Sequence, residues 1–176
     1  MSSIAPLNPE SLEGERRELL EKVESTFGRV PNIFKVFAHS PAVLKFYLGQ
    51  VQSLSEGVLD KKLREQIAVV CASTNKCDYC ASAHTALGQL AGLSAEELKL
   101  NLDGKASDPK SDAALTFVME IIFNHGVTDL ERIREAGYTD EEISEIIAHT
   151  CMNIFTNYFN HIAKIPIDFP LVSTQN

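Results

Sequence analysis

Apolar residues recur along this chain with the spacing of one helical face in nearly every segment. The two-residue alternation of β-strands is missing, and no segment shows strands alternating with helices. All seven prolines fall where helices would begin or end. The pattern predicts an all-α bundle with helices at about 11–27, 32–39, 41–56, 60–74, 78–91, 95–102, 109–125, 129–136 and 140–164.

Short signals mark several of these helix ends. Ser94–Glu97, Thr128–Glu131 and Thr139–Glu142 have the spacing of a capping box, in which two side chains bond each other's backbone N–H groups. Asp108 followed by proline is typical of an N-cap with proline at the first helical position. Glycines, which tolerate the left-handed backbone at helix ends, stand at five predicted termini: Gly28, Gly92, Gly104, Gly126 and Gly137.

Segment 65–71 resembles segment 145–151, which lies 80 residues later. Glu, Ile, Ala and Cys agree in register between the two segments. We interpret the similarity as a duplicated helical unit that carries chemistry only in its first copy. Continuing the register pairs three residues of the first copy with three of the second: Cys77 with Asn157, Cys80 with Asn160, and His84 with Lys164.

Length and composition favour one compact domain. A chain of 176 residues that is 44% hydrophobic can bury a full core. A net charge of −8 without a basic run disfavours nucleic acid as a partner. No apolar run is long enough to cross a bilayer, and the N-terminus lacks the pattern of a signal peptide. We therefore expect a cytoplasmic protein without a membrane partner, in which disulfides are transient and catalytic.

Cys77 and Cys80 form a CxxC pair, and His84 follows four residues later. On a helix the three side chains share one face, with Cys80 and His84 as direct neighbours. An imidazole there can take the thiol proton or stabilise the thiolate. Cys77, however, lies in the first turn, where free backbone N–H groups favour negative charge. The histidine favours Cys80 as the nucleophile, whereas the helix terminus favours Cys77.

Glu65 reaches this group only if the chain bends. On one continuous helix it would lie about 18 Å from Cys77. The polar stretch 73–76 has poor helix propensity, so a break is expected there. With that break, Glu65 can fold back and orient His84. Taken alone, Glu65 and His84 would be ordinary surface or core residues, but beside a CxxC pair they indicate a redox centre.

The remaining cysteines and histidines are not assigned to this centre. We interpret Cys71 and Cys151 as small core residues, because unpaired cysteines usually are. His149 is kept as a reserve candidate, since its helix is expected to face the first unit. The other histidines show no spacing signal: His39, His125 and His161.

The four residues Glu65, Cys77, Cys80 and His84 match a family pattern: Glu, eleven residues, Cys, two residues, Cys, three residues, His. This sequence therefore resembles the redox-active members of the alkylhydroperoxidase D and carboxymuconolactone decarboxylase superfamily. Segments at both ends of the chain resemble its peroxidase-related members as well: 28–34 with 39–41, and 157–163 with 167–170.

The resemblance implies a fold and an assembly. It predicts a single AhpD-like helical domain over 1–176 with an internal helical repeat and an N-terminal helical extension at about 1–40. It also implies a homo-oligomer, as a dimer, trimer or hexamer. Decarboxylase members act without a CxxC pair, so the pair argues against that branch of the superfamily.

The resemblance also implies roles for the four residues. In the peroxidase members the second cysteine attacks the peroxide and the first resolves the sulfenic acid. Carried over, Cys80 is peroxidatic, Cys77 is resolving, and His84 and Glu65 relay the proton. The expected function is a thiol-dependent peroxidase with an antioxidant role and no cofactor or metal. Its partners are a peroxide substrate and an external dithiol reductant.

One departure from the family keeps two alternatives open. The best-characterised members have histidine just before the second cysteine, where this chain has Tyr79. A phenol cannot act as a base near neutral pH. The first alternative is therefore a thiol–disulfide oxidoreductase or redox sensor without peroxide turnover. The second is a zinc-binding or interaction protein with Cys77, Cys80 and His84 as ligands, although no fourth ligand is evident beyond Glu65.

Overall fold

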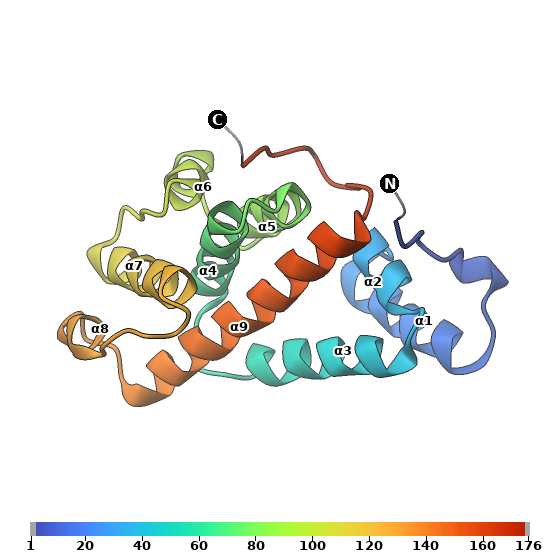
Figure 1. Ribbon diagram of the computed structural model, residues 1–176, viewed down its shortest axis with the longest axis horizontal. Helices are drawn as coiled ribbons and strands as arrows, with labels where there is room; N and C mark the ends of the chain where they lie inside the picture. The colour runs from blue at the N-terminus through green and yellow to red at the C-terminus, as the bar shows by residue number, and fades with distance from the viewer. Residues whose placement is uncertain (1–2, 175–176) are drawn as a thin grey trace.

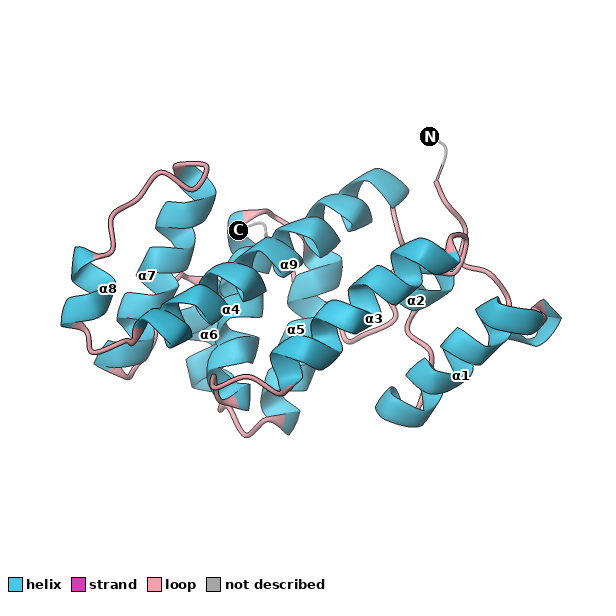
Figure 2. Ribbon diagram, turned by 90° about the horizontal axis from the view of Figure 1, so that it is seen from below, coloured by secondary structure: helices cyan, strands magenta, loops and turns pink. Residues whose placement is uncertain are grey.

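The computed structural model describes residues 3–174, and every regular element in this range is a helix (Figures 1 and 2). The predicted all-α class is confirmed. None of these helices is long and apolar enough to span a membrane. In chain order the elements are η1 (Pro9–Ser11), α1 (Gly14–Phe27), α2 (Asn32–Phe37), α3 (Pro41–Ser55), α4 (Lys61–Thr74), α5 (Asp78–Leu90), α6 (Ala95–Leu102), α7 (Pro109–Phe123), α8 (Glu131–Glu135) and α9 (Asp140–Ala163).

Most predicted boundaries lie within two residues of those observed, but the predicted start of the first helix at residue 11 is wrong. The short 3₁₀-helix η1 comes first, because the Asn8 side chain caps it by accepting a bond from the Glu10 N–H. Leu12 is then extended, with φ −92° and ψ 149°, and α1 begins at Gly14. The extended backbone at Leu12 and Glu13 therefore divides a segment that the apolar pattern treats as one helix.

The three predicted capping boxes have three different outcomes. The box at Thr139–Glu142 is complete, with both reciprocal bonds present. At Ser94–Glu97 only the serine caps, because the Glu97 carboxylate binds Ser107 and Gln66 instead. The box at Thr128–Glu131 is wrong: Thr128 donates to Glu120 of α7, and the Asp129 carboxylate accepts the Glu131 N–H at 3.0 Å instead. A tertiary partner can thus outcompete a local cap.

Helix α9 runs through the middle of the fold, with α1–α3 on one side and α4–α8 on the other (Figure 1). It packs against α3, α4, α5 and α7. The buried apolar residues form two clusters. One cluster joins α4, α7 and α8 to the start of α9. The other joins the N-terminal helices to the end of α9 and the first turn of α5, and it contains Cys77 and Cys80.

The break predicted between α4 and α5 is present. Helix α4 ends at Thr74, and Lys76 adopts a left-handed φ of 57°. The Asn75 side chain donates to Asn157 of α9 at 2.9 Å, which fixes the turn against the neighbouring helix. Helix α5 then begins with Cys77 as its N-cap, one position before the first turn. In contrast, α9 continues without interruption to Ala163.

After α9 the chain passes back over α5, and we call residues 165–174 the C-terminal segment (Figure 1). Its Val172 N–H donates to Ser82 at 2.9 Å. Its Thr174 N–H donates to the Asp78 carboxylate at 2.8 Å. Both acceptors belong to α5, so the C-terminal segment is fastened along the helix that carries the two cysteines.

Glu145 of α9 binds the connection between α3 and α4, away from the C-terminal segment. Its carboxylate accepts the backbone N–H groups of Val58 at 2.8 Å and Leu59 at 3.1 Å, just before α4 begins. It also lies directly against Gly57, where an added Cβ would collide with the carboxylate. One side chain therefore holds the connection between α3 and α4.

We predict that Glu145→Ala lowers the free energy of unfolding by about 1–3 kcal/mol, because two backbone N–H groups, that of Leu59 partly buried, lose their acceptor. Urea denaturation followed by circular dichroism measures this change. Glu18→Ala, at an exposed position of α1, is the control and is expected to stay within about 0.5 kcal/mol of the wild type. Equal losses in the two variants would contradict the prediction.

Candidate redox site

The two cysteines of the CxxC pair meet inside the protein. Their Sγ atoms lie 2.7 Å apart, both thiols are free, and the residues are only 2% and 3% exposed. Cys77 is the N-cap of α5, and its sulfur accepts the Cys80 N–H at 3.4 Å. Two sulfur atoms this close need little movement to form a disulfide.

The two thiols differ in acidity. The pKa of Cys77 is lowered, chiefly by its hydrogen bond with Cys80 and then by the backbone N–H groups at the helix start. Burial and the Asp78 carboxylate act against this. The pKa of Cys80 is raised well above its usual value, first by burial and then by the contact with Cys77. Of the two thiols, Cys77 therefore loses its proton more readily, and Cys80 holds its proton more firmly.

Glu65 and His84 form a second pair beside the sulfurs. The break before α5 brings α4 and α5 side by side, and Glu65 Oε2 lies 2.8 Å from His84 Nδ1. Both side chains are partly buried. The predicted contact between these residues is confirmed. Because Glu65 holds Nδ1, the Nε2 atom is left to face other groups.

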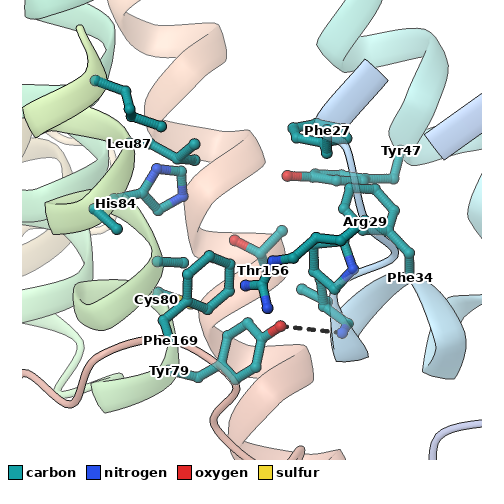
Figure 3. Close-up of a pocket in the computed structure, with 15 residues that line it drawn as sticks. Phe27, Arg29, Phe34, Tyr47, Tyr79, Cys80, His84, Leu87, Thr156 and Phe169 are labelled. Carbon is teal, nitrogen blue, oxygen red and sulfur yellow. Dashed lines mark hydrogen bonds between the residues drawn. The ribbon is translucent and has the colours of Figure 1, made fainter. Parts of the chain in front are cut away.

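A cavity of about 290 Å³ opens beside this group (Figure 3). Cys80 and His84 line it, whereas Cys77 and Glu65 are not among its lining residues in the described chain. Much of the wall is aromatic or aliphatic, and comes from α1, α2, α3, α5 and the C-terminal segment: Phe27, Ile33, Phe34, Tyr47, Leu87 and Phe169. The cavity therefore gives access to Cys80 alone of the two sulfurs.

Sequence reasoning did not identify most of this wall. Tyr47 of α3 points its hydroxyl across the cavity toward α5 (Figure 3). Burial raises the pKa of Tyr47, and negative charge on Cys80 and Glu65 raises it further, so the phenol stays a hydrogen-bond donor. No local motif marks this residue. Arg29 and Phe34 lie within the segment 28–34 that carried part of the family resemblance.

Tyr79, where the family resemblance fails, is engaged in structural bonds. Its hydroxyl accepts the Ile33 N–H at 3.1 Å (Figure 3) and donates to Asp168 at 2.9 Å. Burial raises the pKa of Tyr79 far above the neutral range. Asp168 also accepts the Asn32 N–H at 3.0 Å and lies 3.4 Å from the Arg29 guanidinium. Tyr79 thus joins α5 to α2 and to the C-terminal segment, and its proton is not free for exchange.

The inner face of α9 supplies buried polar groups that sequence reasoning also missed. Thr156 lines the cavity, and Asn160 Nδ2 lies 3.3 Å from Cys80 Sγ. His149, the reserve candidate, is buried on the same face, and its Nε2 has no partner in the described part of the chain. The expectation that α9 faces the first unit is confirmed by its contacts with α4 and α5.

Two further expectations concern the other cysteines and zinc. Cys71 is fully buried, as predicted, but Cys151 is exposed, because it lies on the outer face of α9. Within residues 3–174, no three Cys, His, Asp or Glu side chains gather in an arrangement that could hold a metal ion. The geometry therefore gives the zinc hypothesis no support.

The arrangement defines an all-helical protein with a buried CxxC pair beside a His–Glu pair. Comparison with known proteins supports this description of the fold and the site. The sequence profile of the carboxymuconolactone decarboxylase family matches residues 41–121. A search of curated proteins finds no match. The profile match and the likeness to the solved structures described next confirm the resemblance to the alkylhydroperoxidase D-like and carboxymuconolactone decarboxylase superfamily that was drawn from the four motif residues.

Three solved proteins show the likeness over nearly the whole chain. A peroxidase-related protein from Ralstonia eutropha JMP134, described as an alkylhydroperoxidase AhpD core, is 27% identical with a TM-score of 0.82, covering 97% of this chain and 93% of its own. A peroxidase-related protein from Silicibacter sp. TM1040 is 25% identical with a TM-score of 0.81, covering 93% and 91%. The debrominase Bmp8, also solved as a cysteine-to-alanine variant with 2,3,4-tribromopyrrole, is 19% identical with a TM-score of 0.79, covering 94% and 91%. This last likeness shows the fold alone.

We predict that Tyr79→Phe lowers the free energy of unfolding by about 1–3 kcal/mol, because the Ile33 N–H and Asp168 lose a buried partner. The Cys77–Cys80 disulfide should still form fully after a small peroxide dose, as mapped by mass spectrometry. Tyr158→Phe, at a tyrosine of α9 that is 54% exposed, is the matched control for stability. Unchanged stability with loss of disulfide formation would instead make Tyr79 part of the chemistry.

His149 gives a prediction about pH. Burial, and next the charge of Arg64, lower its pKa to about 4, although Glu145 and Glu65 act in the opposite direction. Because unfolded histidine titrates near pH 6.5, the unfolded state binds this proton first as the pH falls. The contribution of His149 to the free energy of unfolding is therefore fully present above pH 6.5 and is lost as the pH falls toward 4.

The wild type should therefore lose about 1–2 kcal/mol relative to His149→Gln between pH 7.5 and pH 5. Urea unfolding at a series of pH values measures the difference. His125→Asn is the control, because His125 is exposed and asparagine tolerates its left-handed backbone. A constant difference between wild type and His149→Gln over this range would show that His149 does not titrate differently on folding.

Proposed function

We propose that this protein is a thiol-dependent peroxidase that reduces a peroxide through Cys80 and Cys77, with Glu65 and His84 handling the proton. One observation carries the proposal: two free sulfurs lie 2.7 Å apart, and of these two cysteines Cys80 alone lines the cavity that the described residues form. A substrate in that cavity meets one sulfur, while the other stands directly behind it. This is the arrangement that a nucleophile and a resolving thiol require.

The lowered pKa of Cys77 supports this division of roles. Cys77 can accept the Cys80 proton across 2.7 Å, so it acts as the base that prepares the nucleophile. In the sequence, the helix terminus favoured Cys77 as the nucleophile and the histidine favoured Cys80. In this mechanism the two features act on different steps. The helix start favours the resting thiolate at Cys77, and the cavity and His84 favour attack by Cys80.

The reaction balances with these groups. The Cys80 thiolate bonds to one peroxide oxygen as the O–O bond breaks, which gives a sulfenic acid and an alkoxide. The alkoxide takes a proton from His84 in its protonated form, the imidazolium that pairs with the Glu65 carboxylate at 2.8 Å, and a neutral imidazole is left. Cys77 then displaces the sulfenic hydroxyl to form the disulfide, and its own proton leaves with that hydroxyl as water. An external dithiol restores the pair by exchange.

The need to reduce the disulfide after each turnover indicates the cellular compartment. A pair that must be reduced after each turnover needs a reducing compartment, so we propose the cytoplasm. We also propose a homo-oligomer, in keeping with the resemblance. The exposed apolar side chains of α3 and α9 suit such contacts, and include Phe46, Tyr158 and Ile162 at 53%, 54% and 78% exposure.

A thiol–disulfide oxidoreductase or redox sensor is the second candidate. The observation that favours it is Tyr79, which occupies the position of the family histidine and whose hydroxyl is held by Ile33 and Asp168. The same sulfur pair would then cycle without consuming peroxide. Both candidates share the disulfide, so only peroxide turnover separates them.

The test is consumption of cumene hydroperoxide and of hydrogen peroxide with dithiothreitol as the reductant. We expect turnover by the wild type, none above background by Cys80→Ser, and a rate lowered by about 10²-fold in His84→Gln. Cys77→Ser should instead stop at a sulfenic acid on Cys80 that dimedone traps. Cys151→Ser is the control, because Cys151 is exposed and outside the site.

Two outcomes would overturn the proposal. Wild-type turnover no faster than that of Cys80→Ser would exclude peroxidase activity by this cysteine. A Cys77–Cys80 disulfide that forms and is reduced with a protein or small-molecule disulfide, while peroxide is not consumed, would favour the oxidoreductase.

A further inference from the structure

Two buried carboxamides of α9 lie near the reactive sulfur. Asn160 Nδ2 lies 3.3 Å from Cys80 Sγ, and Asn157 lies one turn earlier on the same helix. Both side chains are buried, at 5% and 0% exposure. They occupy the register positions that pair with Cys80 and Cys77 in the internal repeat. The second copy therefore presents amides where the first copy presents thiols.

The two amides are held in place by bonds to other groups. Asn160 Nδ2 also donates to the Thr156 carbonyl at 2.8 Å, which directs its second N–H toward the sulfur. Asn157 Oδ1 accepts from Asn75 at 2.9 Å, so its amide is tied to the break before α5. The fold thus fixes both groups beside Cys80 before any substrate arrives.

Asn157 Nδ2 is a buried donor with no acceptor among the described residues. Leaving such a donor unpaired costs about 1–3 kcal/mol, so buried amides are normally paired. Asn157 lies one turn from Asn160, whose Nδ2 is 3.3 Å from Cys80 Sγ, and hydrogen bonding by Asn157 and by Thr156 acts to lower the pKa of Cys80. An anionic sulfur, or an oxygen newly bonded to it, supplies such an acceptor.

We propose that Asn157 and Asn160 form an anion-stabilising site for Cys80, which holds first its thiolate and then the oxygen of its sulfenate. The proposal rests on the proposed function for the second of these species only. Burial opposes charge on Cys80 more strongly than any other influence. Preorganised N–H donors offset that penalty at the moment when the Cys80 proton leaves.

The experiment measures the acidity of Cys80 without peroxide. In a Cys77→Ser background, the rate of Cys80 alkylation by iodoacetamide is followed against pH, with the site assigned by mass spectrometry. We expect Asn160→Ala to raise the apparent pKa by about one unit, which slows alkylation near neutral pH about tenfold. Asn160→Asp, which keeps the shape but adds negative charge, should raise it further.

Asn153 provides a matched control on the same helix. Its Nδ2 donates to the His149 carbonyl at 2.9 Å, the same bond four residues back that Asn160 makes, and the residue is 3% exposed. Asn153→Ala therefore removes the same backbone bond without touching the sulfur. It should leave the apparent pKa of Cys80 unchanged.

The outcomes separate this inference from the proposed function. If neither Asn160→Ala nor Asn157→Ala raises the apparent pKa, or if Asn153→Ala raises it equally, the anion site is excluded. Circular dichroism identifies a variant that does not fold, and the other amide then carries the test. A shift in pKa together with no peroxide turnover by the wild type would retain the anion site and reject the peroxidase.

Discussion

The interruption between α4 and α5 is the constraint on which the site depends. Without the turn at Asn75 and Lys76, the two helices would form one rod, and Glu65 would lie far from the cysteines. The turn costs a left-handed backbone at Lys76, with φ 57°, and the hydrogen bond from Asn75 to Asn157 compensates for it. It also creates a helix start inside the core, where Cys77 is the N-cap. Acidity at Cys77 and the contact between Glu65 and His84 therefore have one structural origin.

The cavity depends on elements outside that unit. The chain from α1 to α3 and the C-terminal segment supply about half of its lining residues, and α5 supplies most of the rest. The two sides meet through the bonds of Tyr79 with Ile33 and Asp168. Arg29 strengthens the same junction by stacking on Phe169 at 4.3 Å and by its contact with Asp168. A tyrosine between the cysteines thus stands where the family has a histidine that could carry a proton. It instead joins α5 to α2 and to the C-terminal segment. Proton transfer is therefore left to His84 and to the two cysteines.

Sequence reasoning predicted the fold well where the signals are local. Helix boundaries follow prolines and caps, and the complete box at Thr139–Glu142 shows how directly such signals act. The box at Thr128–Glu131 failed because Glu120, on another helix, binds Thr128 instead. Glu65 was placed correctly because the poor helix propensity of 73–76 is itself a local property.

The rest of the site has no local signal. Tyr47 and Phe169 reach the cavity from distant segments, and apolar periodicity only indicates that such residues are buried. Asn157 and Asn160 resemble the polar face of an ordinary amphipathic helix. Only the repeat register pairs them with the cysteines, and it gave no reason to expect contact. Cys151 was misassigned because composition cannot show which side of a long helix faces solvent.

The helix start, the burial of Cys80 and the amides of α9 together decide which sulfur carries the negative charge. A single negative charge over two sulfurs is easiest to hold at Cys77, where the helix start and a neighbouring thiol favour it. Burial keeps Cys80 protonated, so its sulfur is protected from adventitious oxidation while the cavity is empty. Moving the charge to Cys80 requires a proton to cross 2.7 Å and donors to be ready on the far side. Asn160 already lies at hydrogen-bond distance there, so the charge moves between two prepared positions instead of into an apolar wall.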